Sequence, residues 1–310
     1  MEKEIIVKKA GWLYVLKILL TLFVLSMLAS FSLSLFIESE PIGNIAEIPI
    51  KGMITVEESY GFGQQGTSSE ETLKLIEKAS KNPAVKGILL NINSGGGGAV
   101  ASKEIADAVK KINKTTVAVV REIGASGAYW IASATDHIIA NEMSITGSIG
   151  VLGSYVEFSG FLERYNITYQ RLVSGKYKDI GSPLKDLTEA ERDILQEKLD
   201  KIHEHFIKAV AANRNLSLAE ASSLASGEFY LGEEALELGL IDELGDIKTA
   251  EEYFKKELNL TSVALAEYKK PAGFGDFFVS IFSEYFFYIG KGIGSEFFET
   301  KKSSSLEITT

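Results

Sequence analysis

The chain has 310 residues, no cysteine and a formal net charge of −10 at pH 7, and 45% of its residues are hydrophobic. This length allows one large domain or two modest ones with a sizeable apolar core. The acidic balance argues against a nucleic-acid partner, because a phosphate-binding groove needs clustered Lys and Arg. The lack of cysteine excludes disulfides and thiolate zinc sites.

The N-terminal segment predicts one membrane-spanning helix. Residues 18–37 form a run without charged side chains, about the length that a helix needs to cross a hydrocarbon layer. Four lysines precede this run and two glutamates follow it, which predicts a cytoplasmic N-terminus and an extracytoplasmic remainder of the chain. An uncleaved signal anchor is favoured over a cleaved signal peptide, because Ala29–Phe31 is a poor cleavage site.

The remainder alternates between strand-like and helix-like segments. We expect strands at residues 45–50, 85–93, 116–120, 137–140, 151–158 and 167–173, and helices at 70–79, around 105–112, from 188 onward and at 249–258, with two shorter segments at 216–225 and 233–238. Ser68 with Glu71, and Thr188 with Glu191, predict capping boxes at two helix starts. The first strand is expected at a sheet edge because Pro49 has no N–H to donate. This alternation predicts an α/β domain with crossover connections.

The C-terminal composition differs from that of the domain. An aromatic-rich segment at 274–289 is compatible with an interfacial helix, an oligomer contact or a helix docked on the core, and residues 301–310 predict a disordered tail. The predicted parts are therefore an anchor at 1–42, a folded α/β domain at 43–268 and a C-terminal segment at 269–310.

Ser126 is the candidate nucleophile. It lies in the stretch 124–132, where an apolar strand gives way to a helix-compatible run of small residues. A serine at such a turn exposes its hydroxyl beside the free N–H groups of a helix start. The alternative is a tight turn in which Ser126 merely caps the helix.

A serine nucleophile needs a base, and the three histidines are poor candidates. His203 and His205 point to different faces of the long helix and are expected to be solvated, and His137 opens a strand close after Ser126. A desolvated lysine can act as the base instead. Lys176 and Lys178 are equal candidates on chemistry alone, and either could also be an ordinary exposed loop lysine.

The glycine run at 94–98 follows a buried strand and opens a helix, so its backbone N–H groups suit an oxyanion. Gly96 or Gly97 could supply one donor and Gly127 another. The spacing of Gly96, Gly98 and Ala101, with Glu122 further on, also matches a dinucleotide-binding pattern. That match is weak, because consecutive glycines produce it trivially.

Four motifs together carry a resemblance to a known family. They are Asn91–Gly97, Gly124–Tyr129, Ile145–Val151 and Ser174–Asp179. With them the chain resembles the short, single-domain signal peptide peptidase A type of peptidase family S49. The resemblance implies a Clp protease/crotonase-like α/β fold with repeated ββα units after one transmembrane helix.

The resemblance also implies site residues. Ser126 falls on the family nucleophile, Lys178 on the family's general base and acid, and Ser148 on the serine that orients this lysine. The family's usual proline in the glycine turn is replaced by Gly95, so the glycine that completes the oxyanion hole stays open. No cofactor or metal is implied.

The function implied is a serine endopeptidase of the cell membrane that degrades remnant signal peptides and assembles into a ring of identical subunits. An alternative within the hydrolases is a related membrane-bound S49 protease that cuts one specific membrane protein. A non-proteolytic crotonase-like or dinucleotide-binding protein is the alternative from another class.

Overall fold

The computed structural model describes residues 2–36, 42–57, 66–270, 288, 289 and 291. They belong to a compact domain, residues 41–269, and to a second unit composed of the two terminal segments. Nearly all of the aromatic segment at 274–289, and the whole of the predicted tail at 301–310, lie outside the described residues.

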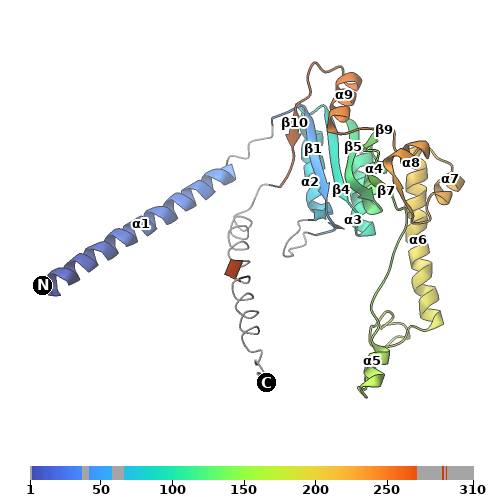
Figure 1. The fold of residues 1–310 in the computed structure, drawn as a ribbon, viewed down its shortest axis with the longest axis horizontal. Coiled ribbons are helices and arrows are strands. Elements are labelled where there is room, and N and C mark those ends of the chain that lie inside the picture. Colours follow the sequence, from blue (N-terminus) through green and yellow to red (C-terminus); the bar gives the residue numbers. More distant parts are fainter. Residues whose placement is uncertain (1, 37–41, 58–65, 271–287, 290, 292–310) are drawn as a thin grey trace, which may run out of the picture. The chain divides into compact units, whose positions relative to one another are not determined.

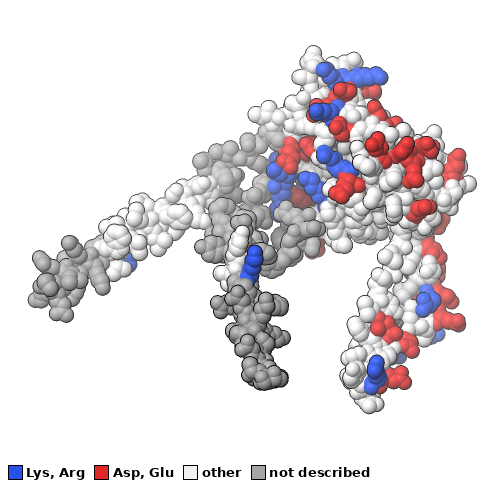
Figure 2. Space-filling model, viewed as in Figure 1, with Lys and Arg blue, Asp and Glu red and all other residues white. Residues whose placement is uncertain are grey.

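Helix α1 (Glu2–Phe36) forms the described N-terminal segment. Its Trp12–Ser32 stretch has 21 residues and a mean hydropathy of 2.1, and none of its side chains is buried. Figure 2 shows the described part of this helix almost free of charge, whereas Lys, Arg, Asp and Glu are spread over the visible face of the domain. The length and composition of this stretch suit a membrane anchor and equally a signal sequence.

The domain alternates strands with helices along the chain (Figure 1). Its elements are β1 (Ile45–Lys51), β2 (Ile54–Thr55), β3 (Thr67–Ser68), α2 (Ser69–Lys81), β4 (Gly87–Ser94), α3 (Ala99–Lys110), β5 (Thr115–Ala125), α4 (Gly127–Ser133), β6 (His137–Ala140), β7 (Ile145–Gly147), α5 (Ser159–Arg164), α6 (Glu189–Arg214), α7 (Leu218–Ser223), β8 (Phe229–Leu231), α8 (Gly232–Glu237), β9 (Glu243–Leu244), α9 (Ile247–Glu257) and β10 (Leu265–Glu267).

One sheet organises the domain. Its strands lie in the order β10–β1–β4–β5–β6–β9, and each neighbouring pair is parallel. The C-terminal end of β5 pairs in addition with β7, which pairs antiparallel with β8. Helices α2, α3 and α4 connect the central parallel strands, as crossover connections must. The predicted α/β class is confirmed.

The sheet is covered on both faces. Ile88 and Leu90 of β4 belong to a cluster with residues of α2, α3, α4 and α6, whereas Leu89 belongs to a second cluster with Phe254 of α9. All four side chains are fully buried. The continuous apolar run in β4 therefore reflects burial on both faces of the sheet.

Two predicted helix starts are confirmed, but only Thr188 and Glu191 form the complete capping box that was predicted for both. The Oγ1 of Thr188 accepts a hydrogen bond from the N–H of Glu191 at 3.4 Å, and the N–H of Thr188 donates to the Glu191 carboxylate at 3.1 Å. At α2, the Oγ of Ser68 accepts from the N–H of Glu71 at 3.4 Å. Both serine and threonine caps satisfy backbone donors that have no partner within the helix.

Two predicted strands are wrong. Residues 151–158 and 167–173 contain no strand in the structure. They belong to an arm, defined here as residues 151–188, which contains α5 and lies away from the sheet near the N-terminal half of α6 (Figure 1). A strand needs a neighbouring strand for its backbone hydrogen bonds. In the described chain no strand lies beside the arm, and side chains such as Leu172 (96% exposed) face solvent.

The expectation that β1 lies at a sheet edge is also wrong, since β1 lies between β10 and β4. Its pairing with β10 covers Ile45–Glu47 and stops there, whereas the pairing with β4 continues through Pro49. Pro49 thus lies beyond the end of β10, so its missing N–H interrupts no hydrogen bond to that strand.

Arg214 at the end of α6 ties this helix to the sheet. Its guanidinium donates to the Asp242 carboxylate at 2.7 and 2.9 Å, and this carboxylate also accepts the N–H of Ile138 in β6 at 2.7 Å. Burial raises the pKa of Asp242, but the hydrogen bonds and charge of Arg214 outweigh it and hold the pKa below its ordinary value of 3.8. The pair therefore stabilises the fold above that ordinary pKa, and the contribution is lost as the pH falls through the lower folded-state pKa.

Replacing Asp242 by Asn should lower the free energy of unfolding at neutral pH by about 2 kcal/mol, because the charged partner of Arg214 is lost. The variant should also lose less stability than the wild type between about pH 5 and about pH 3, since it has no carboxyl to protonate there. Denaturant unfolding followed by circular dichroism at each pH measures both effects. An equal acid dependence in the two proteins would contradict the role given to this pair.

Candidate active site

Ser126 lies on a strained turn between β5 and α4. Its φ is 53° and its ψ is −125°, a backbone conformation that residues other than glycine rarely adopt. Its N–H donates to the carbonyl of Gly147 at 2.8 Å, and its carbonyl accepts from the N–H of Trp130 at 3.0 Å. The side chain makes no capping hydrogen bond to α4. The hydroxyl is therefore not used as a helix cap, and the side chain is only half-buried.

Gly96 packs directly against this turn. Its φ is +98°, and a Cβ atom built on it would lie 2.7 Å from the N of Gly127 and 3.0 Å from the Cβ of Ser126. Real Cβ atoms essentially never approach so closely, so only glycine fits here. The loop after β4 thus comes within contact distance of the serine and of the first residue of α4.

Gly97 lies beside the same turn. Ile54 donates to the carbonyl of Gly96 at 3.0 Å and accepts from the N–H of Gly98 at 2.8 Å. These two bonds do not use the N–H of Gly97. The N of Gly97 lies 3.4 Å from where a Cβ on Gly127 would be, so the amides of Gly97 and Gly127 are close together.

Ser148 follows Gly147, whose carbonyl accepts the N–H of Ser126. Its φ is 49°, its N–H donates to the carbonyl of Glu228 at 2.8 Å, and its hydroxyl donates to the carbonyl of Gly227 at 3.3 Å. The structure thus brings Ser126, Ser148 and the glycines at 96, 97 and 127 to one place, where β4, β5 and β7 end. The carboxyl ends of parallel strands are the usual place for ligands in α/β sheets.

Lys178 is not brought to this place within one copy of the described chain. It is exposed, and its N–H donates to the carbonyl of Gly175 at 3.1 Å within its own loop. Figure 1 shows α5 and the loops beside it at the far end of α6 from α4.

The two candidate lysines differ in their contacts. The Nζ of Lys176 lies 4.8 Å from the centre of the Tyr177 ring, and hydrogen bonding to Tyr177 raises the pKa of Lys176. A lysine that acts as a general base must be neutral near pH 7, so either lysine would need a different environment for that role.

Ion pairs anchor the loop of Lys178. Arg171 donates through Nη2 to the carboxylate of Asp179 at 2.8 Å and lowers the pKa of Asp179 to about 2. Lys185 lies 3.9 Å from Asp179 and 2.5 Å from Glu191 at the start of α6. The residue next to Lys178 is therefore attached to α6 by ion pairs. Opposite charges spaced over a loop are common, so no sequence signal distinguished Arg171 and Lys185.

None of the three histidines is positioned as the base. His137 stacks on Tyr253 with ring centres 4.1 Å apart, and its Nε2 lies 3.2 Å from Glu243. His205 is exposed, as predicted. The prediction that His203 is solvated is wrong, because its ring is partly buried and its Nε2 lies 3.1 Å from the carbonyl of Ile149. A carbonyl only accepts, so this nitrogen carries the proton and cannot take one from Ser126.

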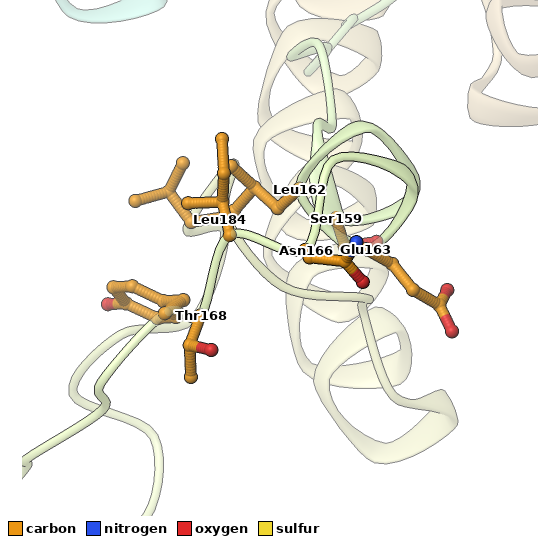
Figure 3. Close-up of a pocket in the computed structure, with 8 residues that line it drawn as sticks. Ser159, Leu162, Glu163, Asn166, Thr168 and Leu184 are labelled. Atoms are coloured by element: carbon orange, nitrogen blue, oxygen red, sulfur yellow. The ribbon is translucent and has the colours of Figure 1, made fainter.

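A cavity of about 450 Å³ lies elsewhere, in the arm (Figure 3). It is lined by Ser159, Leu162, Glu163, Asn166, Ile167, Thr168, Tyr169 and Leu184. Its lining includes none of the predicted catalytic residues. Among the residues that the structure describes, no group of His, Asp and Glu side chains is arranged to hold a metal ion.

Comparisons with known proteins show which family the chain is similar to. A profile of peptidase family S49 matches residues 108–261. A "putative protease" of Methanocaldococcus jannaschii is 34% identical over 243 residues, which cover 78% of this chain and 78% of that protein. A "putative signal peptide peptidase SppA" of Enterococcus faecium is 36% identical over 229 residues, 73% of this chain and 67% of the relative. "Protease 4" of Haemophilus influenzae is 30% identical over 209 residues, 66% of this chain and 33% of the relative.

These similarities define a protease, an enzyme whose substrates are peptides. The chain belongs to peptidase family S49. The resemblance seen in the four sequence motifs is thereby confirmed.

Replacing Gly96 by Ala should lower the melting temperature by about 4 °C or more, because both the positive φ and the contact with Gly127 oppose a Cβ atom. Gly98→Ala is the matched control. Its φ is −60°, and a Cβ there would lie 3.6 Å from the nearest atom, the carbonyl oxygen of Ile54. Differential scanning fluorimetry of both variants should show a much larger loss for Gly96→Ala, and equal losses would refute the close approach.

Proposed function

We propose that this S49 peptidase is a serine endopeptidase that uses Ser126 as nucleophile and Lys178 as base. The observation that supports it best is the strained turn at Ser126, whose hydroxyl has no capping role and whose next residue, Gly127, has its amide close to that of Gly97. Strained residues of this kind cluster at active sites. The proposal includes a Clp protease/crotonase-like arrangement of repeated ββα units, with an anchor at 1–42, a catalytic domain at 43–268 and a C-terminal segment at 269–310.

The chemistry follows from these roles. Neutral Lys178 takes the proton of the Ser126 hydroxyl while the oxygen attacks a peptide carbonyl. The N–H groups of Gly127 and Gly97 stabilise the oxyanion that forms. Gly97 is preferred to Gly96, because the N–H of Gly96 donates to the Oγ of Ser94 at 3.1 Å. Lys178 then gives its proton to the leaving amine, and an acyl-enzyme remains. Lys178 next takes a proton from water, which releases the acyl group and restores the serine.

In this proposal Lys178 reaches Ser126 from a second copy of the chain. The lysine is exposed on the arm, and the arm also exposes apolar side chains, among them Val156 (68%) and Tyr165 (61%). Docking of the arm on a neighbour would bury these side chains and remove water from the amine, which lowers the pKa of a lysine. Ser148 would hold the amine there. Such a contact would join the arm of one copy to the active-site surface of the next. Repeated head to tail, it builds a closed ring when the rotation from each copy to the next adds up to a full turn, in line with a ring-shaped oligomer.

The substrates we propose are remnant signal peptides cut in or at the membrane. The apolar stretch of α1 would keep the enzyme in the cell membrane as a single-pass protein, with the lysine-rich N-terminus in the cytoplasm and the catalytic domain outside. The name of the Enterococcus faecium relative supports this class of substrate. The small residues around Ser126 leave room for a peptide backbone, and favour small apolar side chains near the cut.

Replacing Ser126 or Lys178 by Ala should lower kcat/KM by about 1,000-fold or more, because each removes a partner in bond formation. Lys176→Ala is the matched control in the same loop and should stay within about threefold of the wild type. Cleavage of a quenched fluorogenic peptide with small apolar residues, by the full chain in detergent, measures these values. A kcat/KM within about tenfold of the wild type in either Ala variant would refute the dyad.

Co-expression of the Ser126→Ala and Lys178→Ala chains should restore activity if the two residues come from different copies. In rings assembled at random from equal amounts, about one contact in four joins an intact serine to an intact lysine, so about a quarter of wild-type activity should return. Co-expression of the Ser126→Ala chain with the doubly substituted chain is the control and should return none. Mixed oligomers without activity would show that the base comes from the same copy.

A further inference from the structure

A buried serine near the candidate active site has no hydrogen-bond partner in the described structure. Ser102 lies in α3 and is fully buried, and its Oγ contacts no donor or acceptor among the described residues. Buried hydroxyl groups in folded proteins are almost always hydrogen-bonded, because an unmet polar group destabilises the fold. Two other positions buried on the same helix, Ala101 and Ala106, are alanines. Packing alone therefore gives no reason for a hydroxyl at residue 102.

The hydroxyl of Ser102 lies where a side chain on Gly127 would be. A Cβ atom built on Gly127 would lie 2.2 Å from the Oγ of Ser102 and 3.0 Å from its Cβ. The next atom, the N of Gly97, would be at 3.4 Å, an ordinary contact distance. The φ of Gly127 is not in the left-handed region, so its backbone would accept alanine. The side chain of Ser102 is thus the nearest obstacle to a side chain at residue 127.

We propose that Ser102 is a positioning residue that acts through Gly127. Its hydroxyl presses on the open face of Gly127 and fixes the distance between the amides of Gly127 and Gly97, the two proposed oxyanion donors. This inference rests on the proposed function. It explains why a destabilising hydroxyl is present: the Oγ of Ser102 lies 2.2 Å from the position that a Cβ on Gly127 would take, whereas the Cβ of Ser102, which alanine would keep, lies 3.0 Å from it.

The first test replaces Ser102 by Ala in the full chain. Without the oxygen Gly127 can shift, so kcat should fall about 10- to 100-fold while KM stays within about twofold, as expected when a donor is misplaced in the transition state. The rate at which a fluorophosphonate labels Ser126 should fall by a similar factor. The melting temperature should stay the same or rise by up to about 4 °C, because an unpaired hydroxyl is removed.

Ser133→Ala is the matched control. Ser133 is also fully buried, but its hydroxyl donates to the carbonyl of Trp130 at 2.8 Å and accepts from Asn213 at 3.1 Å. This variant should lose thermal stability and keep its kcat, the opposite of Ser102→Ala. A Ser102→Ala protein with unchanged kcat and labelling rate would overturn the proposal, as would one whose kcat falls only because it unfolds.

The second test examines the contact itself. Gly127→Ala should lower the melting temperature strongly, and Ser102→Gly/Gly127→Ala should restore most of that loss, because the removed serine atoms leave room for the new methyl group. If the double variant instead loses as much melting temperature as the two single variants together, the contact between Ser102 and Gly127 is overturned. This thermal comparison needs no catalysis. If the serine mechanism is wrong, Ser126→Ala keeps its peptidase activity. If the contact between Ser102 and Gly127 is wrong, the melting temperatures show it, so the two failures are distinguishable.

Discussion

The backbone turn at Ser126 is the constraint on which the rest of the site depends. A serine with φ 53° and ψ −125° is strained, at a cost on the order of 1–3 kcal/mol, so neighbouring structure must hold it. Gly147 accepts its N–H and Trp130 donates to its carbonyl, which links β7 and α4 to the turn. Gly96 lets the loop after β4 come close enough to place backbone amides beside the hydroxyl. Loss of any of these contacts would relax the serine toward an ordinary helix cap.

The sheet explains why these pieces meet. Strand β5 pairs with β4 as far as Gly124, with a shift of register after Ile92. On its other side it pairs first with β6 and then, at its last residues, with β7. The carboxyl ends of β4, β5 and β7 therefore converge at one edge of the sheet. The arm with Lys178 follows this edge in sequence but not in space. A peptidase with a base supplied by assembly would stay inactive as a single copy, which would protect other membrane peptides until the subunits associate.

Local rules predicted much of this fold from the sequence. The apolar runs at 85–93 and 116–120 and the Thr188–Glu191 capping box are short-range patterns, and the structure contains each of them. The strands expected at 151–158 and 167–173 are absent because strand pairing depends on a distant neighbour that the pattern does not specify. The roles of Ser126 as nucleophile and of Lys178 as base come from the sequence motifs shared with the family, and they stay predictions. The contact of Ser102 with Gly127 could not be predicted, since it depends on how closely α3 and α4 pack.

Mapping the adduct of a fluorophosphonate probe would test the central claim most directly. The full chain in detergent is labelled, digested and analysed by mass spectrometry, and the modified residue is read from the fragment spectrum. A strained, half-buried serine next to the start of α4 predicts a single adduct on Ser126, formed fastest by the assembled protein. Peptide cleavage that continues while Ser126 stays unmodified, or an adduct on another serine that abolishes activity, would contradict the account.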